Sequence, residues 1–196
     1  IPAKDGSLFK HFSESDPRQI DLLEWVDGTS LGAIDKRGNE SSADVAENYS
    51  KVGGLMARLH NQSESWERPL NFTRHSWDIE GLLGDDPLWG RFWEVEGIDA
   101  NQKDLILRAR NQAKLELAEF GREDDRFGLI HADFLPENLL YNKGAITLID
   151  FDDSGFGWHM FDIATTLFYL VRDRAFSQVL NYFIEGYREH RKLPDN

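Results

Sequence analysis

The stretch that decides the fold is "LIHADFLPENLLYNKGAITLIDFDDSGFG", which runs from Leu129 to Gly157. It begins as a short apolar strand, passes through a polar loop, and continues as two apolar segments on either side of Asn142-Lys143-Gly144. Asn and Gly accept positive φ angles, so this tripeptide predicts a tight hairpin turn. Asp150, Asp152 and Asp153 follow the hairpin, and because clustered carboxylates repel one another, their spacing indicates a divalent cation.

The polar residues of this stretch are of the types that metal-assisted proton abstraction needs. Asp133 follows the buried strand, where a carboxylate can act as a general base if a hydroxyl lies within hydrogen-bond reach. Asn138 and Asp150 offer an amide oxygen and a strand-end carboxylate, which are suitable oxygen ligands for Mg²⁺. Each of them alone is more often a simple turn residue. Together, they predict a cation site in which Asp152 and Asp153 bind a substrate or a second metal.

Two residues near this site have structural explanations. His131 alternates with Asp133 along the strand, and the chain has no cysteine, so we expect a packed, hydrogen-bonded histidine rather than a zinc ligand. Asp162 sits in the apolar run "MFDIA", where an ionised carboxylate must have donors. It either caps a buried helix or accepts backbone N–H groups from the catalytic loop.

An N-terminal hairpin precedes a helical body. Residues 7–12 and 19–26 are predicted to be strands joined by a turn that contains Asp16-Pro17. Two strands alone are marginally stable in water, so this hairpin needs a partner. "DGTSLG", from Asp27 to Gly32, breaks the strand pattern and predicts a hinge.

Apolar spacing predicts four helices in the body. The first helix follows a loop over residues 34–42, and residues 41–44 resemble a capping box at its start. Gly121 ends the second helix. Residues 160–171 are apolar nearly all round, which predicts a buried helix. Elements in the order hairpin, helices, strand, hairpin, helices predict an α+β fold that is mainly helical. Three helices show an apolar stripe: the first carries Val45, Tyr49, Val52, Met56 and Leu59, the second Ile106, Ala109, Ala113, Leu117 and Phe120, and the last Phe176, Val179, Leu180, Phe183 and Tyr187. A separate loop-rich segment is predicted to pack onto the core through Trp66, Trp77, Trp89 and Trp93.

Composition narrows the classes of partner. The 196 residues carry a net charge of −13, which argues against a nucleic-acid partner and is compatible with a cationic substrate, although acidic surfaces also simply keep proteins soluble. No apolar run approaches the roughly 20 residues of a membrane span, and the lack of cysteine fits a reducing compartment. We therefore expect a cytoplasmic protein with no membrane partner. The chain starts "IPAKDGSL" without Met, so we expect a fragment or a processed product.

The motif His-x-Asp-x-x-x-x-Asn, followed by an apolar hairpin and Ile-Asp-Phe, resembles that of the aminoglycoside phosphotransferase and choline kinase family. The segments "VGGLMARLH", "LLEWVDGTSLG" and "SGFGWHMFDIA" match the same family. The resemblance runs from about Gln19 to Tyr187 and is greatest to the branch of homoserine kinase and the bacterial stress-response kinases. It implies the C-lobe of a protein-kinase-like fold, with a short remnant of the N-lobe.

The resemblance implies a role for each residue of the motif. Asp133 corresponds to the catalytic base, and Asn138 and Asp150 correspond to the Mg²⁺ ligands. Asp162 corresponds to the aspartate that braces the catalytic loop, and His131 to a histidine that is structural in the family.

The resemblance also implies how ATP is held. The hinge around Glu24 to Val26 would meet adenine through its backbone, and Leu140 would lie under the base. The chain departs from the family because it has no match to the phosphate-covering loop or the ATP-pairing lysine of the N-lobe. We therefore expect residues 1–28 to be a remnant N-lobe hairpin and hinge, and residues 29–196 to be a helical C-lobe that is inactive on its own.

The function that these features predict is an ATP- and Mg²⁺-dependent phosphotransferase acting on a hydroxyl of a small, amine-bearing molecule. A Ser/Thr protein kinase of the stress-response type is an alternative within enzymes. A non-catalytic helical binding fragment, or a metal-binding module without phosphoryl transfer, is the alternative outside them.

Overall fold

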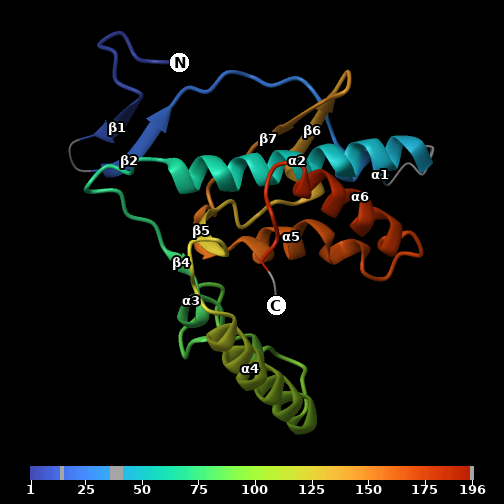
Figure 1. Cartoon of the computed structure of the whole chain (residues 1–196). Helices are drawn as coiled ribbons and strands as arrows, with labels where there is room; N and C mark the ends of the chain where they lie inside the picture. Colours follow the sequence, from blue (N-terminus) through green and yellow to red (C-terminus); the bar gives the residue numbers. More distant parts are fainter. Residues whose placement is uncertain (14–15, 36–41, 195–196) are drawn as a thin grey trace.

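The computed structural model describes residues 1–13, 16–35 and 42–194 of the chain (Figure 1). Helices and short strands are mixed along it, as the prediction of a mainly helical α+β fold requires. Over these described ranges, three small sheets have the strand orders β1-β2, β3-β6-β7 and β4-β8-β5. The elements are β1 (Phe9–Ser13), β2 (Asp16–Asp21), β3 (Thr29–Ser30), α1 (Leu31–Asp35), α2 (Ser42–Ser65), β4 (Ser76–Trp77), α3 (Ile79–Leu83), α4 (Ala100–Phe120), β5 (Phe127–Ile130), β6 (Leu139–Asn142), β7 (Ala145–Leu148), β8 (Gly155–Trp158), α5 (His159–Leu167) and α6 (Phe176–Arg188), with 3₁₀ turns at Phe92–Glu94, Pro136–Asn138 and Phe168–Leu170.

The N-terminal hairpin has different bounds from those predicted. Asp16 begins β2, so Asp16-Pro17 is strand and not turn, and β2 ends at Asp21 rather than at Val26. The chain from residue 22 to residue 28 forms no ladder. It leads to β3, which pairs with β6 and so joins the N-terminal segment to the central hairpin.

The packing of α2 against α6 forms the main core, and both helices were predicted from their apolar stripes (Figure 1). Tyr49, Val52 and Met56 of α2 are buried against Phe183 and Tyr187 of α6. The helices approach closely because Gly53 and Gly186 have no side chains: a Cβ on Gly53 would lie 2.0 Å from the Phe183 carbonyl oxygen, and one on Gly186 would lie 1.9 Å from that of Ser50. The capping box predicted for α2 includes residue 41 and lies outside the described residues.

The hairpin of β6 and β7 is confirmed, with a detail that the sequence did not give. Asn142 pairs with Ala145, so the turn has two central residues. Lys143 (φ 49°) and Gly144 (φ 88°) take the positive φ angles, and not Asn142. This is the pattern of a type I′ turn, whose twist matches that of the strands.

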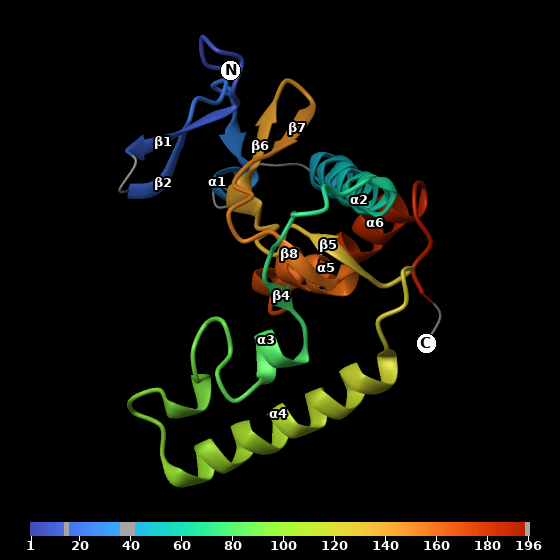
Figure 2. The same cartoon turned by 90° about the vertical axis from the view of Figure 1, so that its left-hand side faces the viewer.

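Helix α4 is confirmed, but it extends away from the body (Figure 2). Asp99 and Gln102 form a capping box at its start, and Gly121 ends it with φ 79°. None of its residues is buried. Its apolar stripe is therefore only partly covered, by α3 and the segment around Trp93.

Two burial predictions are wrong in part. Helix α5 ends at Leu167, and the following 3₁₀ turn carries Phe168 and Tyr169 outward, leaving them 68% and 70% exposed. The predicted buried helix therefore covers only the first part of residues 160–171. Of the tryptophans, Trp77 and Trp93 are buried as expected, but Trp89 is 66% exposed.

Among the described residues, no helix combines the length and apolar character that crossing a membrane requires.

Candidate active site

The predicted catalytic loop begins where β5 ends, and Asp162 of α5 holds its backbone. The Asp162 carboxylate is fully buried. It accepts hydrogen bonds from the backbone N–H of Ala132 at 2.7 Å and of His131 at 3.0 Å. Ala132 has φ 67°, a conformation that costs energy for any residue with a Cβ and persists only where the surroundings impose it. Of the two alternatives for Asp162, the contact with the catalytic loop is therefore the one that is present.

A second residue, His60 of α2, braces the same carboxylate. Its Nε2–H donates to Asp162 at 3.1 Å, and its Nδ1 accepts from the Tyr187 hydroxyl at 2.9 Å. Sequence reasoning missed His60, although one signal was there: it lies four residues after Met56, on the apolar stripe of α2, where a polar side chain needs a buried partner. Burial raises the pKa of Tyr187, so the hydroxyl keeps the proton that it donates.

His131 connects the catalytic loop to the end of β7. Its Nδ1 accepts from the backbone N–H of Asp133 at 3.3 Å, and its Nε2–H donates to the carbonyl of Ile149 at 3.1 Å. The ring is fully buried and meets the ring of Phe151 edge-on, with centroids 4.7 Å apart. Both ring nitrogens are used within the protein, so His131 has no nitrogen left for a zinc ion.

Asp133 and Asn138 face each other across the loop. The Asn138 amide nitrogen donates to the Asp133 carboxylate at 2.7 Å and to the Asp133 carbonyl at 2.9 Å. This fixes the amide so that its oxygen is the atom left for a cation. The backbone N–H of Ile149, the residue before Asp150, donates to the Asn138 carbonyl at 3.0 Å.

Asp150 is exposed and has φ 65°. In the part of the chain that the structure describes, no group of three His, Cys, Asp or Glu side chains could hold a metal ion. Asp152 and Asp153 lie in the turn that follows Asp150, and their assignment to a substrate or a second metal stays a prediction. An amide oxygen and one carboxylate nevertheless fit Mg²⁺, which takes its remaining ligands from water and phosphate.

The predicted hinge residues lie on the surface before β3. Glu24 and Val26 are exposed. The chain then passes directly over Leu140, since a Cβ on Gly28 would lie 2.9 Å from the Leu140 Cβ. The Asn142 amide also donates to the Asp27 carbonyl at 3.2 Å. Residues 27 and 28, at the end of the hinge, are therefore in contact with β6.

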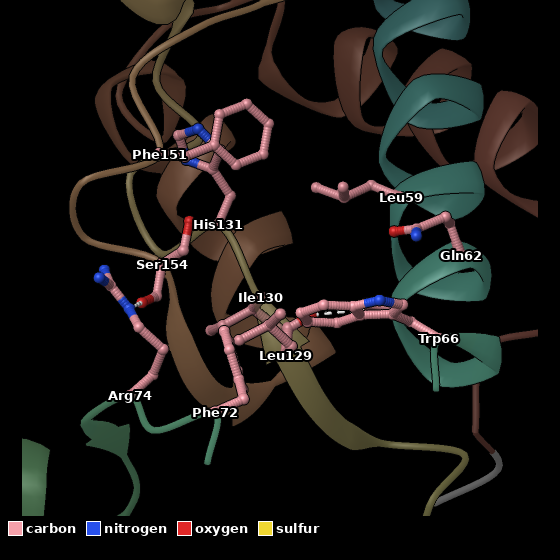
Figure 3. A pocket seen from close by; sticks show the side chains of 11 residues that line it. Leu59, Gln62, Trp66, Phe72, Arg74, Leu129, Ile130, His131, Phe151 and Ser154 are labelled. Carbon is pink, nitrogen blue, oxygen red and sulfur yellow. Dashed lines mark hydrogen bonds between the residues drawn. The ribbon is translucent and has the colours of Figure 1, made fainter. Parts of the chain in front are cut away.

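Two cavities flank the catalytic loop. One, of about 370 Å³, is mostly apolar and lies between the end of α2 and His131 and Phe151 (Figure 3). The other, of about 420 Å³, is lined by Leu135, Pro136, Glu137, Tyr169 and Asp173, among others. Two carboxylates and a tyrosine give the second cavity the chemistry of a site for an organic cation.

Next to the His60 pair lies another buried histidine, His159. Burial lowers the pKa of His159 to about 3, and the positive charge of Arg191 adds to the effect. The rings of His60 and His159 stack with centroids 4.4 Å apart. An imidazole that stays neutral at physiological pH is therefore stacked on His60, which braces Asp162.

The chain is similar to known phosphotransferases and kinases. The phosphotransferase enzyme family matches residues 11–194. The chain is 32% identical over 156 residues to the amicoumacin kinase of Bacillus subtilis (strain 168), which is 74% of this chain and 43% of that protein. A solved microcompartment-associated aminopropanol kinase is 37% identical, with a TM-score of 0.81 over 99% of this chain and 59% of that one.

An amicoumacin kinase in complex with AMP-PNP, Ca²⁺ and Ami has the same fold, with 20% identity and a TM-score of 0.71 over 97% of this chain and 55% of that one. These likenesses confirm the predicted protein-kinase-like fold. The chain spans about half the length of the relatives it matches, from 43% to 59%.

Proposed function

Because the chain belongs to the phosphotransferase enzyme family, we propose that it carries the catalytic loop of an ATP- and Mg²⁺-dependent kinase acting on a hydroxyl of a small molecule. The observation that carries the proposal is the pairing of Asp133 with Asn138 on a loop held by Asp162. Phosphoryl transfer depends mainly on positioning and charge stabilisation. A carboxylate locked in place by an amide and a buried brace supplies the first of these.

Each residue has one task in this proposal. Asp133 accepts the proton of the acceptor hydroxyl, or orients that hydroxyl toward the phosphorus. Asn138 and Asp150 would hold the divalent ion, which when bound neutralises phosphate charge. Asp162 keeps the backbone of the loop in place and has no contact with substrate. Leu140 and the backbone from Glu24 to Val26 would enclose the adenine ring.

For the acceptor, we infer a molecule with an amine. Glu137 lies four residues after Asp133, and its carboxylate rests against α1, because a Cβ on Gly32 would lie only 2.7 Å from it. Asp173 and Tyr169 complete the same cavity. A cation there would be attracted by both carboxylates, and the net charge of −13 would add a favourable long-range field.

The test is ADP release by the full-length protein against a panel of amino alcohols, amino acids and aminoglycosides, with a generic protein substrate as the competing class. An amino alcohol or aminoglycoside should give the highest rate. Asp133→Asn should lower kcat by about 10²–10⁴-fold and leave ATP affinity nearly unchanged. Asp150→Ala should instead remove Mg²⁺-dependent nucleotide binding. Unchanged ATP·Mg²⁺ affinity in Asp150→Ala would refute the metal assignment, and preference for the protein substrate would refute the acceptor class.

We also infer that the chain has two parts with different roles. We infer a cytoplasmic location as well. Residues 1–28 would form the hairpin and hinge of the nucleotide lobe, and residues 29–196 the catalytic body. The sequence has no match to the lysine and phosphate-covering loop that the resemblance implies. The purified 196-residue chain should therefore release ADP far more slowly than the full-length protein. Robust turnover by that chain, abolished by Asp133→Asn, would contradict this division.

A further inference from the structure

Three polar side chains of the 74–77 segment bind the loop that follows Asp150. Arg74, which lies beside Ser154 in Figure 3, donates through Nε to the carbonyl of Ser154. Its Nη2 donates to the carbonyl of Asp152. His75 Nε2 donates to the carbonyl of Asp153 at 3.1 Å, and Trp77 Nε1 donates to the same carbonyl at 2.8 Å. Every main-chain carbonyl from residue 152 to residue 154 is thus bonded by this segment.

The same segment is joined to the strand after the loop. The backbone N–H of Phe156 donates to the His75 carbonyl at 3.0 Å, and β4 pairs with β8 in parallel. Gly155 permits this approach, since a Cβ there would lie 2.8 Å from the His75 carbonyl oxygen. The 74–77 segment therefore has a fixed position against the loop.

These bonds matter because the Asp150 side chain is held only through the backbone on either side of it in the part of the chain that the structure describes. Among the described residues, no hydrogen bond reaches the Asp150 carboxylate, and its backbone is in the left-handed region at φ 65°. On one side, Ile149 is fixed by Asn138 and His131. On the other side, the chain is fixed by Arg74 and its neighbours. The direction of the carboxylate follows from these two attachments.

The 74–77 segment also joins the site to the peripheral helices. Asp78, the next residue, caps α3 by accepting from the Gly81 N–H at 2.9 Å, and it pairs with Arg122 beyond α4 at 3.0 Å. A shift of the α3–α4 unit would therefore move residues that bind the loop.

We propose that Arg74, His75 and Trp77 are positioning residues for the divalent-metal site, holding the loop so that Asp150 and Asn138 face one ion. The inference rests on the proposed function, because it takes Asp150 as the metal ligand. Trp77 is 2% exposed and also belongs to the core, so its removal would disturb the fold. Arg74 is exposed and is the residue to change.

The experiment measures Mn²⁺ affinity of the full-length protein with AMP-PNP by electron paramagnetic resonance, together with hydrogen exchange over residues 150–156 without metal. Groups behind a metal ligand typically contribute 10–100-fold to metal affinity. Arg74 acts through the backbone, so we expect Arg74→Ala to weaken Mn²⁺ binding about 10-fold, at the lower end of that range. Exchange should quicken over residues 150–156 alone. Arg74→Lys keeps one donor and should recover part of the affinity.

Arg68 gives the matched control. It lies in the same connection, over the ring of Phe156 at 5.2 Å, and Arg68→Ala should bind Mn²⁺ like the wild type. The proposal is overturned if Asp150→Ala loses the metal while Arg74→Ala keeps wild-type affinity. It is also overturned if Arg74→Ala quickens exchange throughout the protein, since that is a general loss of stability. Wild-type Mn²⁺ affinity in Asp150→Ala would refute the metal site itself, and exchange over residues 150–156 would then decide whether Arg74 holds the loop.

Discussion

Replacing Asp162 with alanine tests whether its carboxylate braces the catalytic loop. The substitution leaves three buried donors without their acceptor: the N–H groups of His131 and Ala132, at 3.0 and 2.7 Å, and His60 Nε2, at 3.1 Å. Each unsatisfied buried donor costs about 1–3 kcal/mol. Because water can enter the space left by the carboxylate, the lower half of the summed range applies, roughly 3–6 kcal/mol. That is a large share of the ~5–15 kcal/mol that stabilises a typical domain.

The assay is thermal unfolding followed by circular dichroism. For a chain of this size, 1 kcal/mol shifts Tm by roughly 2–4 °C, so Asp162→Ala should lower Tm by about 6–24 °C. Asp104 supplies the control, because it pairs with Arg108 at 3.0 Å on the exposed surface of α4. Such pairs contribute about 0–1 kcal/mol, and Asp104→Ala should change Tm by only a few degrees. A Tm for Asp162→Ala within that small range, with activity alone reduced, would refute the bracing role.

Three more predictions concern stability. His159 has a pKa of about 3 in the folded protein and an ordinary value of 6.5. Between these values the unfolded chain binds a proton that the folded chain does not, so the free energy of unfolding should fall as pH drops from 6.5 toward 3, by about 1.4 kcal/mol per pH unit. Urea unfolding at several pH values should show this slope, and His159→Phe should flatten it. Gly53→Ala should cost about 1–3 kcal/mol, because the new Cβ would lie 2.0 Å from the Phe183 carbonyl, whereas Gly54→Ala meets only side-chain atoms at 3.3 Å or more and should leave the urea midpoint equal or higher. Asp99→Ala removes the capping box of α4 and should cost about 1 kcal/mol, seen as faster hydrogen exchange in its first turn; an unchanged rate would mean that the cap is not what holds this end.

Elements that depend on neighbouring residues could be predicted from the sequence. The stripes of α2 and α6, the stop of α4 at Gly121, and the turn between β6 and β7 were all predicted correctly. Helical periodicity and turn chemistry act over a few residues, so they can be read locally. The order of polar groups from His131 to Asp150 was visible for the same reason, since they share one loop and one hairpin.

Burial at the ends of elements could not be predicted in this way. Residues 160–171 are apolar throughout, but whether each side chain is covered depends on what packs there. The change from α5 to a 3₁₀ turn at Phe168 exposes residues whose composition predicts a core. The predicted end of the second strand in the N-terminal hairpin was wrong for a similar reason. Strand β2 ends at Asp21, opposite the first residue of its partner β1, although the apolar residues of the sequence continue beyond it.

By itself, the sequence determined the main helices, the central hairpin and the group of polar residues on the catalytic loop. Only the tertiary structure decided what holds that group in place. His60 meets Asp162 across 102 positions of sequence, and Arg74 meets Ser154 across 80. The physical reason is that periodicity fixes local backbone conformation, whereas contacts between distant residues depend on how helices and sheets pack, and one chain's local pattern is compatible with many such packings.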